Sequence, residues 1–386
     1  MSSRLLLALL VASTGLARSQ PSGINAPDPA TELTTAAVLR VMERAADWQL
    51  ANPSTHSPTD WTQAAGYAGI MALADISSSQ RFLDSMLKMA TASRWKLGSR
   101  IYHADDHCVG QTYAELFFRF KDPSMIAPMR EQFDWILVHP KDGDLDFDAA
   151  RNPDRLDRWS WCDSLFMAPP AWIRLFAATS AKAYMDFAVE KWWQTSDFLY
   201  DRGEHLYFRD STCFAKREAN GKKVFWSRGN GWVLAGLVRV LQYLPTDHPA
   251  RPRFLEQFRD MAGTILGCQQ PDGLWRTSLL DPADYPLKET SGSGFFCYAL
   301  AWGINQGLVD RTRFKPAVVN AWRGLAGCVT DEGRLTHVQP IGSDPKSFDE
   351  TTTEIYGVGA FLLAGSEVYR LLQNAPGPVT GHAAPR

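Results

Sequence analysis

The sequence lacks the features that mark several common classes of protein. Its six cysteines form no CxxC pair, and no histidine stands at zinc-ligand spacing from them, so we assign no metal and no cofactor. Forty basic residues stand against forty-two acidic ones, and the basic residues are scattered along the chain. Without a basic cluster there is no electrostatic footprint for nucleic acid, so a nucleic-acid partner is not expected.

Long apolar runs are also scarce. The exception is the N-terminus, where Arg4 precedes an apolar run over residues 5–12, and Ala17 and Ser19 occupy the small-residue positions before a cleavage site. This pattern is typical of a secretory signal peptide over residues 1–19, with a buried N-terminal helix as the alternative. No later segment holds about 18 uncharged apolar residues. We therefore expect no membrane partner, and export to the periplasm or the extracellular space.

Disulfide bridges are permitted in such a compartment. However, Cys108, Cys162 and Cys297 lie inside apolar or aromatic runs, where a buried free thiol is the commoner state. We therefore expect core thiols, with disulfide bridges as the alternative.

What the sequence does contain is an alternation of two kinds of helical segment. In the first kind, apolar residues recur every three or four positions and charges occupy the other face. The second kind is apolar on nearly all sides, as expected for a helix buried between other layers. The amphipathic segments are residues 31–52, 78–95, 123–140, 180–200, 250–269 and 311–329, and the apolar segments are residues 61–76, 109–120, 164–179, 231–244, 292–308 and 355–372.

Six amphipathic helices alternating with six apolar ones predict an all-α fold, the (α/α)6 barrel, in which an outer ring of helices surrounds an inner ring. The long parallel strands that an α/β barrel needs are missing. Strand-like pieces around "HLYFRDS" and "GLWRTSL" predict short β-hairpins on the rim. The barrel would form one catalytic domain over residues 31–372, followed by a Pro-, Gly- and Ala-rich tail, 373–386, that we expect to be disordered.

The loops that lead into the inner helices should gather at one end of a central funnel. These loops are rich in aromatic, carboxylate, guanidinium and hydroxyl groups. Aromatic faces stack on sugar rings, and a few polar groups can fix hydroxyl or acid groups. The predicted ligand is therefore an oligosaccharide.

Asp163 is the strongest candidate for catalysis. It is flanked by Trp159, Trp161 and Phe166 in "WSWCDSLF". An aromatic setting of low dielectric raises the pKa of a carboxyl group, as a general acid near neutral pH requires, and Trp161 would also contact the sugar. The alternative is that Asp163 is only the N-cap of the helix that follows.

A second carboxylate comes from the adjacent pair Asp105 and Asp106. It could raise the pKa of Asp163 by repulsion or accept hydrogen bonds from sugar hydroxyl groups. Because neighbouring residues point apart, we expect one of the two in the funnel, and we choose Asp106, which is nearer the following helix. Either aspartate could instead cap that helix.

The stretch "FWSRGNGW" has the composition of a substrate-binding turn. Gly229 and Gly231 would allow a tight turn and a close approach to a ligand. Trp226 and Trp232 could present ring faces, and Arg228 could hold a carboxylate with two parallel hydrogen bonds. The alternative places both tryptophans in the core and pairs the arginine with an internal aspartate.

Two serines in "ETSGSG", Ser291 and Ser293, complete the predicted substrate-binding set. Their hydroxyl groups could bind an acid group of the substrate, or the stretch could be an ordinary helix N-terminus.

The phrases "WCDSLFMAPP", "FWSRGNGWVLAGL", "DGLWRTSLLDP", "ETSGSGFF" and "YGVGAFLLAGSEVY" resemble the unsaturated glucuronyl and galacturonyl hydrolases of glycoside hydrolase family 105, which is related to family 88. The resemblance runs from about residue 35 to residue 372. It implies an (α/α)6 barrel that removes a 4,5-unsaturated uronic acid from the non-reducing end of oligosaccharides left by polysaccharide lyases.

The resemblance also implies residue roles. The family's catalytic aspartate matches Asp163, and its second aspartate best matches Asp106. The tryptophans and arginine of the "WSRGNGW" stretch match a substrate-binding loop of the family. Some rhamnogalacturonan-acting relatives carry a binding histidine in the preceding hairpin, where this chain offers His205 and Arg209.

Two other functions fit the same residues. The first is an inverting glycosidase or a polysaccharide lyase on the same barrel, with Asp106 and Asp163 as the carboxylate pair. The second is a non-catalytic oligosaccharide-binding protein whose aromatic funnel holds the ligand.

Overall fold

The computed structural model describes residues 33–373. The predicted signal peptide, residues 1–19, lies outside the described residues, as does the predicted tail apart from Gln373. Export and the disorder of the tail therefore stay predictions.

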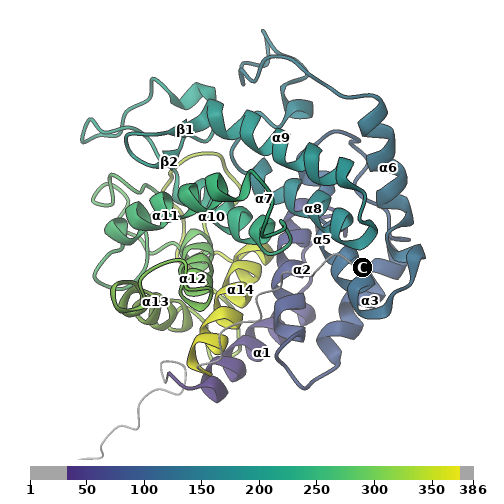
Figure 1. Cartoon of the computed structure of the whole chain (residues 1–386). Coiled ribbons are helices and arrows are strands. Elements are labelled where there is room, and N and C mark those ends of the chain that lie inside the picture. The colour runs from purple at the N-terminus through teal and green to yellow at the C-terminus, as the bar shows by residue number, and fades with distance from the viewer. Residues whose placement is uncertain (1–32, 374–386) are drawn as a thin grey trace, which may run out of the picture.

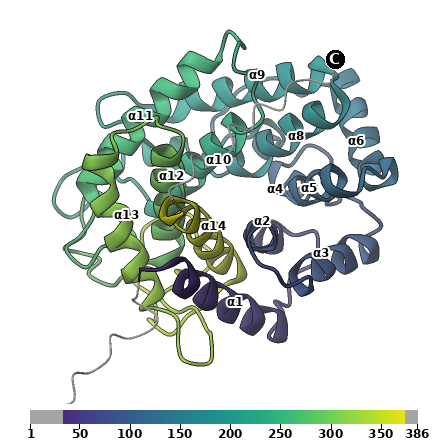
Figure 2. The ribbon, with the colours of Figure 1, turned by 60° about the horizontal axis from the view of Figure 1, so that its bottom comes forward.

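Twelve long helices alternate between an outer and an inner ring (Figures 1 and 2). The predicted (α/α)6 barrel is confirmed, and all twelve predicted segments contain a helix. The outer helices are α1 (Thr35–Ala51), α3 (Arg81–Ala92), α6 (Ala127–Val138), α9 (Lys182–Leu199), α11 (Arg251–Cys268) and α13 (Arg311–Ala326). The inner helices are α2 (Trp61–Ala74), α5 (Gly110–Phe120), α8 (Pro169–Thr179), α10 (Ser227–Leu241), α12 (Thr290–Asn305) and α14 (Ile355–Leu372).

The apolar composition of the inner helices reflects burial on all sides. Every residue of α10 and of α12 is buried. By length and composition, α14 is the one helix within residues 33–373 that could cross a membrane, but 83% of it is buried inside the protein. It packs between α2 and α12 (Figure 2), so its hydropathy is that of a core helix.

Short helices, 3-10 turns and strands lie between the long helices, at the ends of the barrel. They are α4 (Ala104–His107), α7 (Ser164–Met167), the 3-10 turns Pro123–Met125, Arg155–Arg158 and Ser211–Cys213, and the strands β1 (Tyr200–Asp201) and β2 (Leu206–Tyr207). β1 and β2 form one of the predicted hairpins. The second predicted hairpin, around "GLWRTSL", is wrong. This stretch makes only the isolated bridges Trp226↔Ser278 and Trp275↔Glu289.

The helix predicted over residues 164–179 is interrupted. α7 ends at Met167 and α8 begins at Pro169. Pro169 and Pro170 have no N–H to donate and their rings clash with a preceding helical turn, so the helix cannot run through without a break. The break places the short helix α7, which Asp163 precedes, on the rim.

The predicted turn at "SRGNG" is also wrong. α10 begins at Ser227, so Gly229 and Gly231 are helical, and neither has a positive φ. Their small size is used for packing instead. A Cβ on Gly229 would lie 3.1 Å from the Cys162 sulfur, and one on Gly231 would lie 3.2 Å from Cβ of Phe295.

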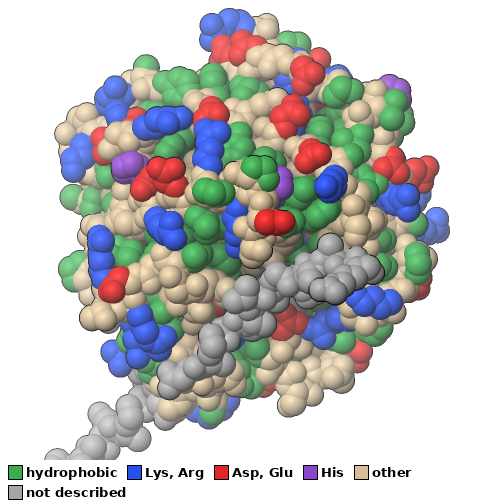
Figure 3. Space-filling view, in the orientation of Figure 1, with side chains coloured by type: hydrophobic (Ala, Val, Ile, Leu, Met, Phe, Trp, Pro, Cys, Tyr) green, Lys and Arg blue, Asp and Glu red, His purple; other side chains and the backbone are tan. Residues whose placement is uncertain are grey.

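The expected thiols are confirmed, since all six cysteines are free and all but Cys268 are buried. On the surface, lysine and arginine side chains are interspersed with aspartate and glutamate over the face shown in Figure 3.

Glycine residues also close the inner ring where its first and last helices meet. A Cβ on Gly359 in α14 would lie 2.2 Å from the carbonyl oxygen of Ala65 in α2, and one on Gly69 would lie 2.4 Å from the carbonyl oxygen of Gly359. Backbone atoms cannot move aside as a flexible side chain can, so these positions admit no larger residue without separating the two helices.

We predict that Gly359→Val lowers the free energy of unfolding by about 3 kcal/mol or more, because it overpacks a backbone contact. The matched change is Gly263→Ala in the outer helix α11, where an added Cβ meets no atom within 4 Å. This variant should gain about 0.4–1 kcal/mol from reduced freedom of the unfolded chain. Thermal unfolding followed by circular dichroism compares the two, and equal midpoints would contradict the role assigned to Gly359.

Candidate active site

The loop that carries Asp163 is held by buried contacts on both sides. The carbonyl of Trp159, a residue with φ of 57°, accepts a hydrogen bond from Thr195 Oγ1 at 2.8 Å. The amide of Cys162 donates to the carbonyl of Arg209 at 2.8 Å. A non-glycine residue with positive φ costs free energy and persists only where its surroundings fix it, as they do here. The second bond brings Arg209 beside Asp163.

The Asp163 carboxyl group is nearly withdrawn from water. Its side chain keeps 11% of its exposure, and burial raises the pKa of Asp163 above its usual range. The guanidinium groups of Arg209 and Arg228 lower that pKa, and the charge of Asp210 raises it. Burial is the largest of these effects, so the group favours the protonated form more than a solvated aspartate does.

The Asp163 side chain does not cap the helix that follows it. It stands at the N-cap position of α7, but its side chain accepts no hydrogen bond from the helix N–H groups. The alternative reading of this residue is therefore wrong. Two polar groups lie beside the Asp163 carboxyl group: the Cys162 thiol, with its sulfur 3.8 Å from Oδ2, and Arg209, with Nε 3.5 Å from Oδ2.

The sequence offered Arg209 only together with His205, in the place of a binding histidine of some relatives, and gave it no role beside Asp163. Its Nη1 binds Asp210 at 2.7 Å, and its guanidinium lies 4.6 Å from the centre of the Phe147 ring. Its buried Nε has no hydrogen-bond partner among the described residues. The side chain is thus held in place by Asp210 and Phe147, and its Nε forms an ion pair with the Asp163 carboxyl group at 3.5 Å without a hydrogen bond.

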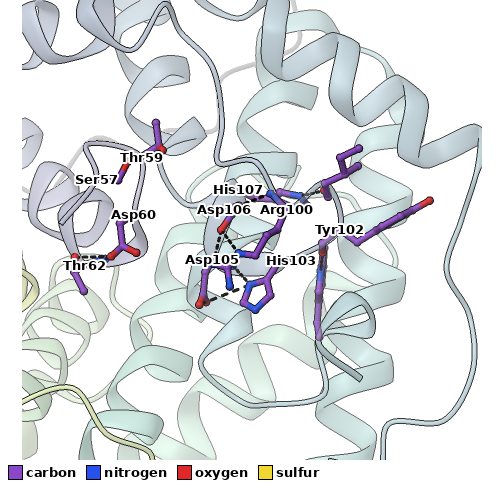
Figure 4. Close-up of polar contacts among 12 residues, drawn as sticks. Ser57, Thr59, Asp60, Thr62, Arg100, Tyr102, His103, Asp105, Asp106 and His107 are labelled. Atoms are coloured by element: carbon purple, nitrogen blue, oxygen red, sulfur yellow. Dashed lines mark hydrogen bonds and ion pairs between the residues drawn. The ribbon is translucent and has the colours of Figure 1, made fainter. Parts of the chain in front are cut away.

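The pair Asp105 and Asp106 is arranged opposite to our expectation (Figure 4). Asp106 is turned to Arg100. Its Oδ2 accepts from the Arg100 amide at 2.7 Å, and its Oδ1 accepts from Nε at 3.0 Å and from Nη2. The carboxylate that we expected in the funnel is therefore occupied in bracing a loop.

Asp105 has the properties that were expected of Asp106. Burial raises the pKa of Asp105 to about 7, with the charge of Arg100 opposing and the charges of Asp163, Asp106 and Asp60 adding. Its Oδ2 lies 3.7 Å from Nδ1 of His103, whose own pKa burial lowers to about 4, so the imidazole is neutral at neutral pH. Asp105 is the member of the pair that is electrostatically coupled to Asp163.

The Arg228 guanidinium is not free to bind a carboxylate with two parallel hydrogen bonds, as was predicted. The side chain is fully buried, with Nη1 donating to the carbonyl of Gln339 and Nη2 to that of Pro340 at 2.8 Å. Its guanidinium lies 4.5 Å from the centre of the Trp226 ring and 4.9 Å from that of Tyr356. Its two terminal nitrogens thus bind the loop before α14, and the buried Nε has no hydrogen-bond partner within residues 33–373. Bidentate capture of a carboxylate by this arginine is not possible in this arrangement.

The predicted tryptophans belong mainly to the wall behind the site. Trp161, Trp226 and Trp232 are each at most 3% exposed. Trp161 packs on His103 with ring centres 5.0 Å apart, and Trp226 donates from Nε1 to Gln339 Oε1 at 2.8 Å. Large flat exposed faces for sugar stacking are therefore not offered by these three rings.

Trp61 is a more accessible ring that the sequence analysis did not single out. It begins α2, is partly exposed, stacks on Tyr356 at 5.2 Å, and meets Trp232 edge-on at 6.0 Å. The sequence feature that could have identified Trp61 is its place in "DWTQ", directly after Asp60, the aspartate that caps α2. Trp61 thus lies at the start of a helix on the rim, as Asp163 does before α7.

Ser291 and Ser293 take the ordinary structural alternative. Both are fully buried. Ser291 donates to Glu289 Oε1, the cap of α12, and Ser293 Oγ accepts from the Trp275 amide at 2.9 Å. The prediction that they bind substrate is not supported by these contacts, because neither hydroxyl group reaches an open surface.

Among residues 33–373, no group of three or more His, Cys, Asp or Glu side chains is placed to hold a metal ion. The chemistry that this arrangement offers is proton transfer by a buried carboxyl group, with a second titratable carboxyl group and a cation close to it.

Comparison with known proteins agrees with this architecture. The profile of Glycosyl Hydrolase Family 88 matches residues 34–372. An unsaturated 3S-rhamnoglycuronyl hydrolase of Formosa agariphila is 39% identical over 340 residues, which cover 86% of this chain and 90% of that protein.

Solved structures share the fold. A glycosyl hydrolase family 88 protein from Bacteroides vulgatus has a TM-score of 0.78 and 29% identity, covering 88% of this chain and 100% of that one. A protein described as a polysaccharide lyase has a TM-score of 0.79 and 31% identity, covering 88% of this chain and 98% of that one. The resemblance seen in the sequence is thereby confirmed, and the chain belongs to glycosyl hydrolase family 88 and is a glycoside hydrolase.

Proposed function

We propose that Asp163 hydrates the double bond of a 4,5-unsaturated uronic acid at the non-reducing end of a lyase-generated oligosaccharide. The enzyme removes the unsaturated uronic acid, as its family membership and its relative of 39% identity indicate. The observation that carries the catalytic assignment is the Asp163 carboxyl group, which is buried, bound to no helix N–H, and raised in pKa.

The proposed reaction needs one carboxyl group for both proton transfers. Asp163 donates its proton to C4 of the enol ether, which leaves positive charge at C5 and on the ring oxygen. Water then adds at C5 and returns a proton to the Asp163 carboxylate. The resulting C5 hemiketal opens by breaking the bond between C5 and the ring oxygen, which leaves a ketone at C5 and a hemiacetal at C1. The hemiacetal then breaks its bond to the next sugar, which leaves as the protonated hydroxyl of a shortened oligosaccharide while C1 becomes an aldehyde. Protonation, addition of water and release balance without a metal, an oxidant or a reductant.

Arg209 would stabilise the intermediate state of that cycle. After Asp163 has given up its proton, its carboxylate carries a full negative charge in a site of low dielectric. A guanidinium group 3.5 Å away lowers the free energy of this charged form. Burial favours the acid and Arg209 favours the base, so together they keep both forms accessible to one residue.

We propose Asp105, rather than Asp106, as the second carboxyl group. Its pKa of about 7 and its coupling to Asp163 suit a group that orders water or accepts hydrogen bonds from sugar hydroxyl groups. The substrate would rest against Trp61, with its carboxylate near the guanidinium of Arg209. Because the relative from Formosa agariphila is named for a 3S-rhamnoglycuronyl linkage, fragments with that linkage are the first substrates to test.

The enzyme would act outside the cytoplasm. We propose this from the signal-peptide pattern of residues 1–19, in which Arg4 precedes a short apolar run. Export would place the enzyme where lyase products of external polysaccharides arise.

The decisive assay follows the ultraviolet absorbance of the conjugated double bond. We expect the purified protein to abolish this absorbance in 3S-rhamnoglycuronyl, pectic or glycosaminoglycan lyase products, and Asp163→Asn to reduce the rate by about 10²–10⁴-fold, the range for a positioned acid–base group. A lyase would create the absorbance from intact polysaccharide, and an inverting glycosidase would release reducing sugar from saturated substrates. Saturable binding with unchanged ligand would indicate a binding protein, and any of these three results would reject the proposal.

The two adjacent aspartates give a second prediction with its own internal control. Asp105→Asn should lower kcat by about 10²-fold, at the low end of the range for acid–base groups, and leave thermal stability nearly unchanged. Asp106→Asn should instead lower the free energy of unfolding by about 1.5 kcal/mol, because it weakens charge-assisted hydrogen bonds to the half-exposed Arg100. The reverse pattern would restore Asp106 as the catalytic partner.

A third prediction concerns pH. An acid must be protonated to act, so the rate falls as pH rises through the pKa of Asp163. Since Arg209 lowers that pKa, Arg209→Gln should move the alkaline limb of the kcat profile to higher pH, whereas Arg209→Lys should keep it near that of the unchanged enzyme. A shift to lower pH in the glutamine variant, or none, would contradict the electrostatic role.

A further inference from the structure

A cavity opens on the barrel axis at the end away from Asp163. Its volume is about 440 Å³, within the range of small-molecule sites. Side chains from the later turns of all six inner helices line it, whereas Asp163 precedes the first turn of α7. None of the residues proposed for catalysis borders this cavity.

The floor of this cavity carries more positive than negative charge. Arg174 and Arg239 are 1% and 3% exposed. Both donate to one oxygen, Oε1 of Glu115, Arg174 from Nε at 2.9 Å and Arg239 from Nη2 at 2.7 Å. Two buried cations thus share one carboxylate. A buried charge without a partner is costly, so an anion in the cavity would lower the free energy of this floor.

The other arginines around the cavity do not supply the missing negative charge. Arg119 pairs with Asp75, and Arg370 pairs with Glu367 at 2.8 Å. Each of these mouth arginines has its own acidic partner and adds no surplus. The imbalance therefore belongs to the floor.

The ends of the inner helices do not remove the imbalance either. Helix C-termini carry partial negative charge, and cations near them are favoured. Arg174 satisfies one such end, since its Nη1 donates to the carbonyl of Arg239 at 3.1 Å. Arg239 is in the last turn of α10, but its Nε and Nη2 donate to the side chains of Gln111 and Glu115 and not to helix carbonyls.

One polar group beside the guanidiniums, the Tyr298 hydroxyl, can complete a binding site. The Tyr298 hydroxyl accepts from Gln242 Nε2 at 3.3 Å, so its own proton is available to donate. Tyr243 lies between the Arg174 guanidinium, 4.5 Å from the centre of its ring, and the stacked ring of Phe118, and so helps to hold Arg174 in place. Both tyrosines line the cavity.

We infer that this cavity binds a small oxyanion, a carboxylate or a sulfate group, carried on a molecule of up to monosaccharide size. The anion would face Arg239 and Tyr298 and balance the second guanidinium of the Arg174–Glu115–Arg239 group. The oxyanion has two sources, inorganic sulfate or a sugar acid, and the cavity is large enough for either.

Isothermal titration calorimetry of the full chain tests this inference. The probes are sodium sulfate, sodium glucuronate and neutral glucose, each at constant ionic strength set with sodium chloride. We expect saturable binding of one sulfate or one glucuronate per chain, and no heat from glucose. Binding of sulfate alone still supports the site and identifies its ligand as inorganic, whereas no binding of either anion overturns it.

The informative variant is Gln242→Glu. Gln242 Oε1 accepts from Arg174 Nη2 at 3.3 Å, so a glutamate of nearly the same shape would supply the missing negative charge. Anion affinity should fall at least about tenfold, while hydrolysis of unsaturated oligosaccharides stays unchanged. Ala72→Glu at the partly exposed mouth places the same charge in the cavity and should have the same effect if the first variant does not fold.

Two controls separate this site from the rest of the protein. Gln80→Glu makes the same charge change at the exposed start of α3 and should leave anion binding intact. Asp163→Asn should also bind both anions as the unchanged enzyme does. Glucuronate binding that is lost in Asp163→Asn, or anion binding that persists in Gln242→Glu, would overturn the inference.

Discussion

Burial of the Asp163 carboxyl group, opposed by two guanidinium groups, is the interaction on which the proposed chemistry depends. Burial disfavours the charged carboxylate and raises the pKa of Asp163, whereas the charges of Arg209 and Arg228 stabilise the carboxylate and lower that pKa. Either effect alone would fix the residue in one protonation state, as an inert neutral acid or as an ordinary ion pair. Their combination requires a barrel wide enough to hold a polar group at its rim and closed enough to exclude most water from it.

The loop before α14 supports this balance from a distance in sequence. Gln339 accepts from Trp226 through its side chain, and its carbonyl accepts from Arg228 and from the Tyr356 hydroxyl at 2.7 Å. Its amide donates to Glu289 Oε1 at 3.3 Å. One residue therefore joins the first turns of α10, α12 and α14. Arg228 acts on Asp163 through its charge while its hydrogen bonds serve the loop, so it is a positioning residue in this arrangement.

Sequence periodicity predicted the fold well because each helix of a two-layer barrel has a distinct pattern of burial. Asp163 was also found from local sequence, since the aromatic residues that bury it are its chain neighbours. The remaining site depended on contacts that local sequence does not contain. Asp106 is occupied because a four-residue helix turns it back to Arg100, and Arg228 is occupied because Gln339, 111 positions later, reaches it. The glycines at 229 and 231 were assigned to a turn, although they serve helix packing.

The direction of the inner helices sets different electrostatics at the two ends of the barrel. Their N-termini surround the funnel, where partial positive charge favours an anionic substrate such as a uronate. Their C-termini surround the far cavity, where partial negative charge favours cations, and the arginines of α5, α10 and α14 gather there. The helix ends alone would therefore make the far cavity unfavourable to anions. The buried arginines reverse that tendency only because two of them, Arg174 and Arg239, share the single carboxylate of Glu115. The net positive charge of these three side chains therefore determines whether the cavity can accept an anion.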